Sequence, residues 1–290
     1  MAYSQHLIKF WGGSLFELLL PAARRDLETD QHSGRFLRAK RWILYARATR
    51  ARRRGDTAAL QKNLFQYWHA DTSDAYFDRY EERFQQWFMG PHHEIVDQLA
   101  KLAESGAYNR LVEVGCGSGR VLEHCAAMMP EVPLCIGVDI NPSIIDRDRA
   151  HYAANPRLQF LAADASEWLA KTAQPGTILL TYGGVMEYFA PETLVAMFRD
   201  LAAHGPAAVA LVEPVDPAHD LAHDNASHAF GDEHSFSHNH AQLLLQAGYE
   251  LHFHKALTLG LQSWIMLVAT TARPLGQQAT SLPTKGYPTR

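Results

Sequence analysis

An apolar strand that runs into a glycine-rich turn constrains this chain more than any other feature. The strand reads Leu-Val-Glu-Val from Leu111, the turn reads Gly-Cys-Gly-Ser-Gly from Gly115, and a helical pattern begins at Arg120. Glycines in such a turn adopt positive φ and let a ligand approach the backbone closely. The helix that follows has free N–H groups in its first turn. We therefore expect a nucleotide-like ligand at the carboxyl end of a parallel sheet.

The spacing of these glycines distinguishes between classes of nucleotide. The dinucleotide fingerprint G-x-G-x-x-G would place its third glycine at position 120, where this chain has Arg120. The glycines instead follow G-x-G-x-G, with Glu113 two residues upstream. This spacing argues against NAD or a flavin dinucleotide, although one displaced glycine does not decide the matter. A Walker phosphate loop is excluded, because no Gly-Lys-Ser/Thr follows.

Short apolar runs alternate with helical patterns from residue 91 onward. This alternation predicts an α/β fold with a doubly wound, mainly parallel sheet of seven strands. The last two strands are joined by too short a connection for a parallel crossover, so we expect a C-terminal antiparallel hairpin. The expected strands are Arg110–Val114, Leu134–Ile140, Leu158–Ala163, Thr177–Tyr182, Ala207–Glu213, Tyr249–Leu257 and Gln262–Thr270, and the helices between them include Pro91–Ala103, Arg120–Met129 and Pro191–Ala203.

The chain before residue 91 has a helical pattern and many aromatic side chains. Phe77, Tyr80, Phe84 and Trp87 follow the i, i+3, i+7, i+10 spacing of one helix face. We expect three parts, namely a helical cap or lid (1–90), an α/β domain (91–272) and a polar, poorly ordered tail (273–290).

Two aspartates follow the next two strands. Asp139 comes twenty residues after Gly119, where a carboxylate can accept hydrogen bonds from both hydroxyls of a ribose. Asp164 follows the third strand, where an adenine amino group would need an acceptor. Each aspartate alone could equally be an ordinary turn or helix cap. Three strand ends in register with a glycine turn favour a nucleotide site.

The run from Glu113 to Gly119, with Asp139 and Asp164-Ala165, resembles the class I S-adenosylmethionine-dependent methyltransferases over about residues 91–272. The resemblance implies a Rossmann-like enzyme that uses S-adenosylmethionine and releases S-adenosylhomocysteine. The three glycines would pass under the methionine part of the cofactor, Asp139 would hold the ribose and Asp164 the adenine edge. The cofactor-binding residues implied in this way are Glu113, Gly115, Cys116, Gly117, Gly119, Asp139, Ile140, Asp164, Ala165 and Thr181.

The large aromatic cap favours a small organic acceptor, of the secondary-metabolite kind, methylated on oxygen, nitrogen or sulfur by in-line displacement. The Asn-Pro-Pro-Tyr signature of base and glutamine methylation is absent after the fourth strand. Packing of the cap onto the α/β domain would explain the aromatic residues equally well. Candidates for the walls of the acceptor pocket are Tyr67, Trp68, Tyr76, Tyr80 and Trp87, and we assign substrate binding to Tyr76, Tyr80 and Glu213.

A hydroxyl or thiol acceptor would need a general base. Tyr182 and Glu187 follow the fourth strand, and six histidines lie within residues 219–240. Among these histidines we favour His234 and His238, because Ser237 is expected to cap the next helix and fix the chain there. Tyr182, His234 and His238 are therefore the catalytic candidates. The spacing matches no zinc signature and no cysteine contributes, so a surface loop is the alternative and no metal is expected.

The charge is distributed unevenly along the chain. Residues 1–60 carry twelve Lys/Arg against five Asp/Glu, whereas the whole chain has a formal net charge of −4. The segment Arg35–Arg54 holds nine basic residues and no acidic one. A solvated helix face is the simplest interpretation. The alternatives are docking of an anionic substrate, RNA or a peptide, or a non-catalytic binding module at an anionic membrane that also uses Phe10–Leu20.

Composition limits the partners and the cellular location that we expect for the protein. The sequence pI of about 6.5 is low for a nucleic-acid-binding protein, so nucleic acid is disfavoured as a partner. No apolar run reaches the length of a membrane span, and no signal peptide is expected. The chain has only three cysteines. We expect a cytoplasmic enzyme and leave open whether it forms a homodimer.

Overall fold

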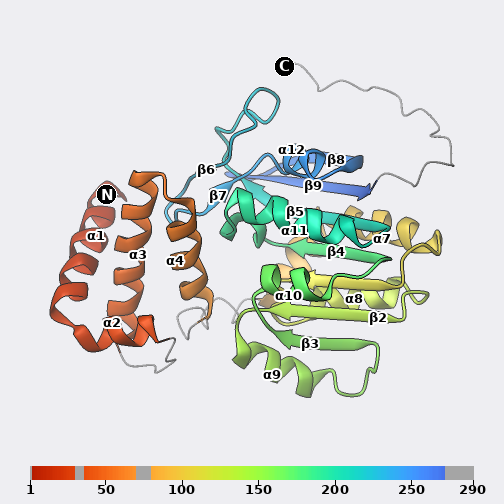
Figure 1. The fold of residues 1–290 in the computed structure, drawn as a ribbon, viewed down its shortest axis with the longest axis horizontal. Helices are drawn as coiled ribbons and strands as arrows, with labels where there is room; N and C mark the ends of the chain where they lie inside the picture. The colour runs from red at the N-terminus through yellow and green to blue at the C-terminus, as the bar shows by residue number, and fades with distance from the viewer. Residues whose placement is uncertain (1, 30–35, 70–79, 272–290) are drawn as a thin grey trace.

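The sheet of this protein has seven strands in the order β3-β2-β1-β4-β5-β9-β8 (Figure 1). The computed structural model describes residues 2–29, 36–69 and 80–271. Strands β1 to β5 are parallel, and β9 pairs antiparallel with both β5 and β8. The strand bounds are β1 (Arg110–Val114), β2 (Leu134–Asp139), β3 (Leu158–Ala162), β4 (Thr177–Tyr182), β5 (Ala207–Val215), β8 (Tyr249–Leu259) and β9 (Gln262–Thr271). The predicted fold class is confirmed.

Apolar side chains cover both faces of the sheet. In β4, Ile178 and Leu180 belong to one core cluster, and Leu179 between them belongs to the other. The first cluster packs under α7 (Glu94–Glu104) and α8 (Arg120–Met128), and the second packs under α10 (Ala165–Thr172), α11 (Pro191–Ala203) and α12 (His240–Gln246). Helix α9 (Pro142–His151) lies beside β3 (Figure 1). Burial on both faces is why these strands appear as continuous apolar runs.

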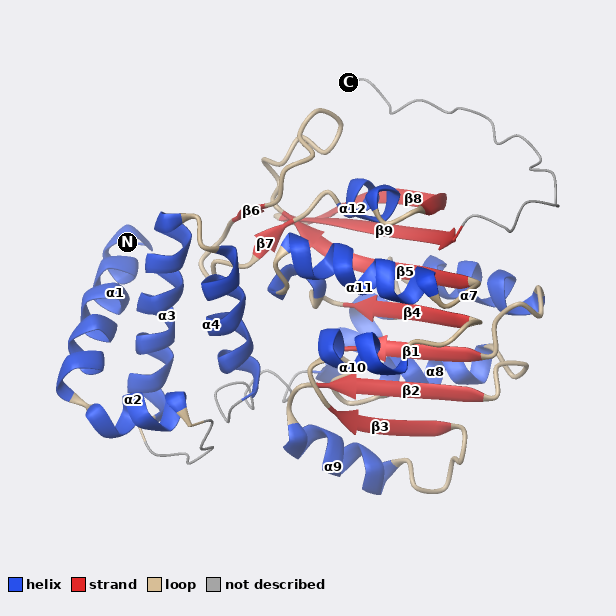
Figure 2. Cartoon of the chain, viewed as in Figure 1, coloured by secondary structure: helices blue, strands red, loops and turns tan. Residues whose placement is uncertain are grey.

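Four N-terminal helices stand at the carboxyl ends of the parallel strands (Figure 2). They are α1 (Ala2–Leu19), α2 (Pro21–Glu28), α3 (Leu37–Arg54) and α4 (Thr57–His69). Their contact with the rest of the chain includes Phe236, which packs with Leu60 and Leu64 of α4. Phe236 belongs to β7 (Phe236–Ser237), which forms a small antiparallel sheet with β6 (His228–Ala229). The loop after β5 is thereby attached to the helices.

The segment that joins these helices to the sheet differs from the expected stripe. Helix α6 (Tyr80–Arg83) continues into the π-helical turn η2 (Phe84–Phe88), in which the Met89 N–H donates to the Phe84 carbonyl at 3.0 Å. The wider turn buries Phe84 and Phe88 and leaves Trp87 half-buried. Phe77 lies outside the described residues. The predicted spacing of one helix face assumes 3.6 residues per turn, and the π-helical turn departs from that period at Phe84–Phe88.

The three-part division at residues 90 and 272 stays a prediction, and the expected tail lies outside the described residues. Among the described residues, no helix is both long and apolar enough to cross a lipid bilayer.

Candidate active site

The glycine turn between β1 and α8 has the backbone that the sequence predicts. Gly115, Gly117 and Gly119 have φ of 69°, 53° and 70°. A Cβ atom at Gly115 would lie 2.6 Å from a methyl group of Val185, and one at Gly119 would lie 2.8 Å from the rings of Tyr152 and Phe160. Side chains are excluded at both positions by conformation and by space. The turn therefore exposes its backbone to whatever binds there.

Asp139 holds this turn from the neighbouring strand. Its Oδ2 accepts the Gly117 N–H at 3.1 Å, and its Oδ1 accepts the Asn141 N–H at 2.9 Å. Burial raises the pKa of the Asp139 carboxyl, and these backbone hydrogen bonds oppose the rise. The carboxylate therefore fixes the distance between the turn and the end of β2.

Asp164 caps α10, because its Oδ1 accepts the N–H groups of Ser166 at 2.8 Å and Glu167 at 3.3 Å. The Ser166 hydroxyl donates to the same oxygen at 2.6 Å. Oδ2 has no protein partner among the described residues. Capping and ligand contact are thus compatible at this side chain.

A cavity of about 110 Å³ lies over these strand ends, and we call it the glycine-turn pocket. Six of the ten predicted cofactor residues line it, namely Gly115, Gly117, Asp139, Ile140, Asp164 and Ala165. The other four, Glu113, Cys116, Gly119 and Thr181, do not line it. Glu113, Cys116 and Thr181 are buried. These four residues shape the turn and the strand ends from the protein side.

Glu113 is a buried carboxyl group beneath the glycine turn. Its side chain is buried, and Oε2 has no hydrogen-bond partner among the described residues. Burial raises the pKa of the Glu113 carboxyl well above its usual range, and the nearby Asp148 and Asp139 add to the rise. Burial therefore favours the protonated form of this carboxyl over the charged form.

Glu213, predicted to bind substrate, bonds to its own chain instead. Its Oε1 accepts the Thr181 hydroxyl at 2.7 Å, and its Oε2 accepts the N–H groups of Val185 at 2.9 Å and Met186 at 3.0 Å. Burial raises the pKa of this carboxyl to about 7, against these hydrogen bonds. Glu213 lines neither cavity. It holds the turn between β4 and the short helix η3 (Met186–Tyr188).

A second, larger cavity of about 550 Å³ adjoins the glycine-turn pocket, and we call it the aromatic cleft. Four residues, Trp68, Tyr182, Gly183 and Tyr188, line both cavities. The aromatic residues of the cleft are Trp68, Phe84, Trp87, His92, Tyr182, Tyr188, Phe230 and Trp264. A ligand in the first cavity and one in the second would therefore meet at Tyr182 and Gly183.

His92 lies among the rings of this cleft. Its ring centroid is 4.9 Å from that of Trp264 and 5.7 Å from that of Tyr182, and its Nδ1 lies 3.4 Å from the Tyr182 hydroxyl. Burial lowers the pKa of His92 to about 4. Its Nε2 and the Trp264 Nε1 are both buried without a partner among the described residues. The cleft thus contains two unsatisfied polar nitrogens.

Glu187 is the carboxyl group of the cleft with the strongest perturbation. Burial raises its pKa to about 8, and hydrogen bonds to Ser235 and Tyr188 partly oppose the effect of burial and of the nearby Glu213 and Glu233. A carboxyl that titrates near neutral pH beside a ligand cavity can accept a proton there.

The two favoured histidines lie elsewhere. His234 packs against α3, with Nε2 2.9 Å from the Thr49 hydroxyl and Nδ1 3.1 Å from an Arg52 nitrogen. His238 is buried, with Nδ1 2.7 Å from the Ser227 hydroxyl and Nε2 3.1 Å from the Phe189 carbonyl. Neither histidine lines either cavity. Their catalytic role stays a prediction that this geometry does not favour.

The predicted helix cap after these histidines was wrong. Asn239 caps α12 by accepting the Gln242 N–H at 3.2 Å, whereas Ser237 accepts the Asp216 N–H at 3.0 Å.

Of the other predicted residues, Tyr182 and Trp68 line both cavities, and Trp87 lines the cleft. Tyr76 lies outside the described residues, and Tyr80 begins α6.

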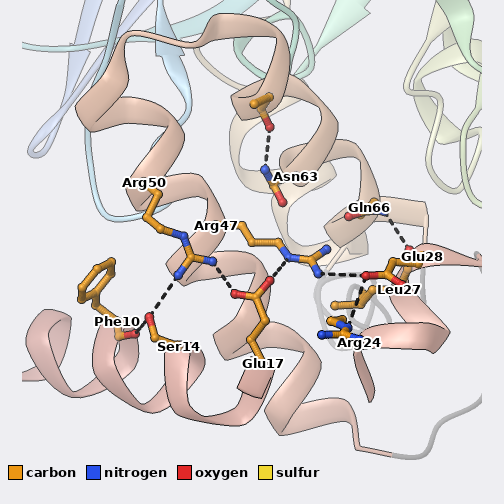
Figure 3. A network of polar contacts seen from close by, with 11 residues as sticks. Phe10, Ser14, Glu17, Arg24, Leu27, Glu28, Arg47, Arg50, Asn63 and Gln66 are labelled. Atoms are coloured by element: carbon orange, nitrogen blue, oxygen red, sulfur yellow. Dashed lines mark hydrogen bonds and ion pairs between the residues drawn. The ribbon is translucent and has the colours of Figure 1, made fainter. Parts of the chain in front are cut away.

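The basic segment on α3 directs several of its charges into the N-terminal helices (Figure 3). Glu17 of α1 lies between Arg47 and Arg50, with 2.7 Å from its Oε1 to Arg47 Nε, and it also pairs with the Arg50 guanidinium. Arg50 also donates to the Ser14 hydroxyl at 3.1 Å. Arg52 contacts His234. These arginines therefore serve contacts within the chain.

The chain is similar to known methyltransferases. A family model described as a methyltransferase domain matches residues 111–205. Magnesium protoporphyrin IX methyltransferase from Synechocystis PCC 6803 with bound SAM is 17% identical, with 73% of this chain and 97% of that chain covered at a TM-score of 0.50. The same enzyme with bound SAH is 17% identical, with 73% and 99% covered at 0.51.

A third solved structure, an S-adenosylmethionine-dependent methyltransferase from Clostridium acetobutylicum ATCC 824, is 9% identical, with 68% of this chain and 99% of that chain covered at a TM-score of 0.50. A search of curated proteins gives no match. At these identities the structural likeness is one of fold.

The matched domain and the fold point to the same cofactor. The match begins at Leu111, where β1 leads into the glycine turn, and ends after α11, so it includes both Asp139 and Asp164. The open backbone of the turn and two strand-end carboxylates on one cavity suit an adenosyl ligand. Residues 111–205 therefore match a methyltransferase domain, and the chain shares its fold with solved methyltransferases that bind S-adenosylmethionine.

Proposed function

We propose that this enzyme methylates a small organic acceptor bound in the aromatic cleft. The observation that carries the proposal is the shared wall of Trp68, Tyr182, Gly183 and Tyr188 between the cleft and the glycine-turn pocket. An acceptor in the cleft would reach the cofactor only at this wall. The eight rings favour a planar, largely apolar molecule, and the unsatisfied nitrogens of His92 and Trp264 favour a polar substituent on it.

Six residues would hold the cofactor directly, namely Gly115, Gly117, Asp139, Ile140, Asp164 and Ala165. Bound S-adenosylmethionine supplies a methyl group that its sulfonium already activates. The chain must then align the acceptor and exclude water, which can lower the barrier by about 7–11 kcal/mol in favourable cases. The aromatic walls would do both.

A hydroxyl or thiol acceptor would lose its proton to Glu187. This carboxyl lines the cleft, and its pKa of about 8 suits a group that takes a proton near neutral pH. Tyr182 and His92 lie on the same cleft and would orient the acceptor. We prefer this assignment to His234 and His238 because both histidines are engaged by neighbouring side chains or carbonyls away from the cleft.

The N-terminal helices would act as the lid of the cleft, to which α4 contributes Trp68. The inward pairing of Arg47 and Arg50 weakens the alternative of RNA or peptide docking. The membrane alternative keeps one favourable observation, since α1 exposes Leu7, Ile8, Trp11, Leu15, Leu18 and Leu19. Three buried free thiols are compatible with the reducing cytoplasm that we propose as the location.

Calorimetric titration with S-adenosylhomocysteine, with NAD in parallel, tests the cofactor site. We expect S-adenosylhomocysteine to bind with micromolar affinity. This binding should be lost in Asp139→Ala, and NAD should not bind. Asp139→Asn keeps the shape of the side chain and guards against misfolding. Transfer of a labelled methyl group from the cofactor into a low-mass product of a cell extract then tests the acceptor class. Label that appears only in RNA or protein would overturn the small-molecule proposal.

A further inference from the structure

Three side chains that can bind a metal lie close together in the segment between β5 and β7, outside both cavities. His219, Asp224 and His228 each offer one ligand atom, and these atoms lie within 4.8 Å of one another. His219 is buried, His228 is half-buried and Asp224 is exposed. We propose that these three residues bind one divalent transition-metal ion of the Zn²⁺ type. The proposal does not depend on the acceptor or on the cofactor.

Each histidine is oriented by a partner on its other ring nitrogen. His219 Nδ1 lies 2.8 Å from the Ser237 hydroxyl, and His228 Nε2 lies 3.3 Å from Asp216 Oδ2. Histidines that bind a metal almost always donate their second N–H to a carboxylate, carbonyl or water, which fixes the tautomer and the ring. The Ser237 hydroxyl here accepts in the same way. These two contacts leave His219 Nε2 and His228 Nδ1 as the ligand atoms.

One oxygen of the Asp224 carboxylate has no hydrogen-bond partner within the described part of the chain. Asp224 Oδ1 accepts the Ala226 N–H at 2.8 Å, so Oδ2 is the oxygen that would bind the metal. His219 Nε2 lies 3.3 Å from the Asp224 carbonyl in this structure, and metal binding would replace that long contact. Zinc bonds to nitrogen and oxygen measure about 2.0–2.2 Å, so the three ligand atoms, which lie within 4.8 Å of one another, would draw closer together around the ion.

The donor set selects the class of ion. Two imidazoles and one carboxylate suit Zn²⁺ and its neighbours among the first-row metals, whereas Mg²⁺ and Ca²⁺ prefer oxygen ligands alone. Three protein ligands leave one tetrahedral position for water. Pro217 and Phe230 flank the ligand segment on either side and both line the aromatic cleft. A bound metal would therefore fix the shape of one cleft wall.

The test uses the full chain without a polyhistidine tag, stripped with a chelator and titrated calorimetrically with ZnCl₂. We expect one Zn²⁺ per chain and at least a 100-fold loss of affinity in His228→Ala and in Asp224→Asn, neither of which is buried. Cobalt as a second probe should give the visible d–d bands of a tetrahedral site, and these bands should disappear in both variants. Ser237→Ala should weaken binding about 10- to 100-fold, because it releases His219.

Two matched controls identify the site. His223→Ala removes an exposed imidazole of the same loop and should leave zinc affinity unchanged. His124→Ala breaks the other close pair, in which the Nε2 atoms of His93 and His124 lie 3.2 Å apart, and should also leave it unchanged. Loss of binding in His124→Ala, unchanged binding in His228→Ala, or the absence of stoichiometric binding would overturn the proposal.

Discussion

The Glu213 carboxylate of β5 accepts the hydroxyl of Thr181 on the neighbouring strand β4 at 2.7 Å. The same carboxylate accepts the N–H of Val185, whose side chain packs against Gly115 of the glycine turn. One buried acid thus connects the end of β4 to the predicted cofactor site without touching either cavity.

Glu213→Gln should weaken binding of S-adenosylhomocysteine about tenfold. The amide keeps one acceptor oxygen but loses the charge of the carboxylate, so its hydrogen bonds to the backbone N–H groups weaken, a loss of about 1–3 kcal/mol. Calorimetric titration of parent and variant measures the difference. Glu250→Gln changes an exposed glutamate of β8 and is the matched control. Equal affinity in the Glu213 variant would show that the turn keeps its shape without this acceptor.

Glu187 should titrate near pH 8, because burial raises the pKa of its carboxyl to about 8. The group is protonated below that pH and becomes a base above it, so methyl transfer to a hydroxyl acceptor should accelerate as the pH rises through 8. A ¹³C-carboxyl NMR titration checks the pKa without any acceptor. One resonance should move near pH 8 and be missing in Glu187→Gln. If every glutamate resonance that moves near pH 8 persists in Glu187→Gln, the assignment is contradicted.

The buried histidines should destabilise the protein in acid. Burial lowers the pKa of His92 and His234 to about 4 and that of His238 to about 3. The unfolded chain takes up these protons below a pH of about 6.5, whereas the folded chain does so only near pH 4. Their contribution to stability is therefore complete above about pH 6.5 and is lost as the pH falls toward 4.

Thermal unfolding of parent and His234→Gln between pH 8 and pH 4.5 tests this pH dependence. The Tm of the parent should fall more steeply with acid than that of the variant, so the difference between them should shrink. The exposed His223 provides the control variant His223→Gln, for which the difference should stay constant. Parallel curves for parent and His234→Gln would contradict the expected pKa shift.

Glu17→Gln should lower the stability of the N-terminal helices. Glu17 bridges Arg47 and Arg50, and all three side chains are mostly buried. Burial raises the pKa of Glu17, but its bonds to the two arginines outweigh that effect and lower the pKa overall. Removing the acid leaves two guanidinium groups facing each other, at a cost of about 1–3 kcal/mol. Urea unfolding measures this loss of stability. The control is Asp146→Asn, which removes the exposed i,i+3 ion pair between Asp146 and Arg149.

The same network makes a prediction about RNA. Parent protein should show no salt-dependent binding to a labelled RNA in fluorescence anisotropy, because Arg47 and Arg50 already pair within the chain. Binding that weakens steeply with salt, and that falls further in Arg53→Ala, would return the RNA alternative to first place.

Most of the sheet could be predicted because each buried strand carries its signal locally. β1 and β4 have the predicted bounds, and the other strands differ by no more than two residues at either end. The glycine turn and the two strand-end aspartates were also visible, because positive φ and a capping carboxylate depend on few neighbours. These features predicted six residues that line the glycine-turn pocket.

The roles of the histidines could not be predicted from the local sequence. His238 is held by Ser227 and by the Phe189 carbonyl, 49 residues away in the sequence, and no local pattern reveals such partners. The place of His92 has the same kind of cause, since its neighbours Tyr182 and Trp264 come from β4 and β9. Trp87 was predicted as a wall of the acceptor pocket and does line the cleft, but the 3.6-residue period did not predict the π-helical turn that carries it.

The position of β9 determines the order in which this sheet can fold. β9 forms a tight hairpin with β8, in which Leu259 pairs with Gln262, yet its other edge pairs with β5, where Ala208 faces Thr270. The hairpin closes a very short loop and can form early, whereas docking on β5 must close a loop of about fifty residues between Val215 and Ser263. Until that happens, the apolar strand β5 has an open edge. Refolding of this protein should therefore be most sensitive to aggregation in the interval between hairpin formation and docking.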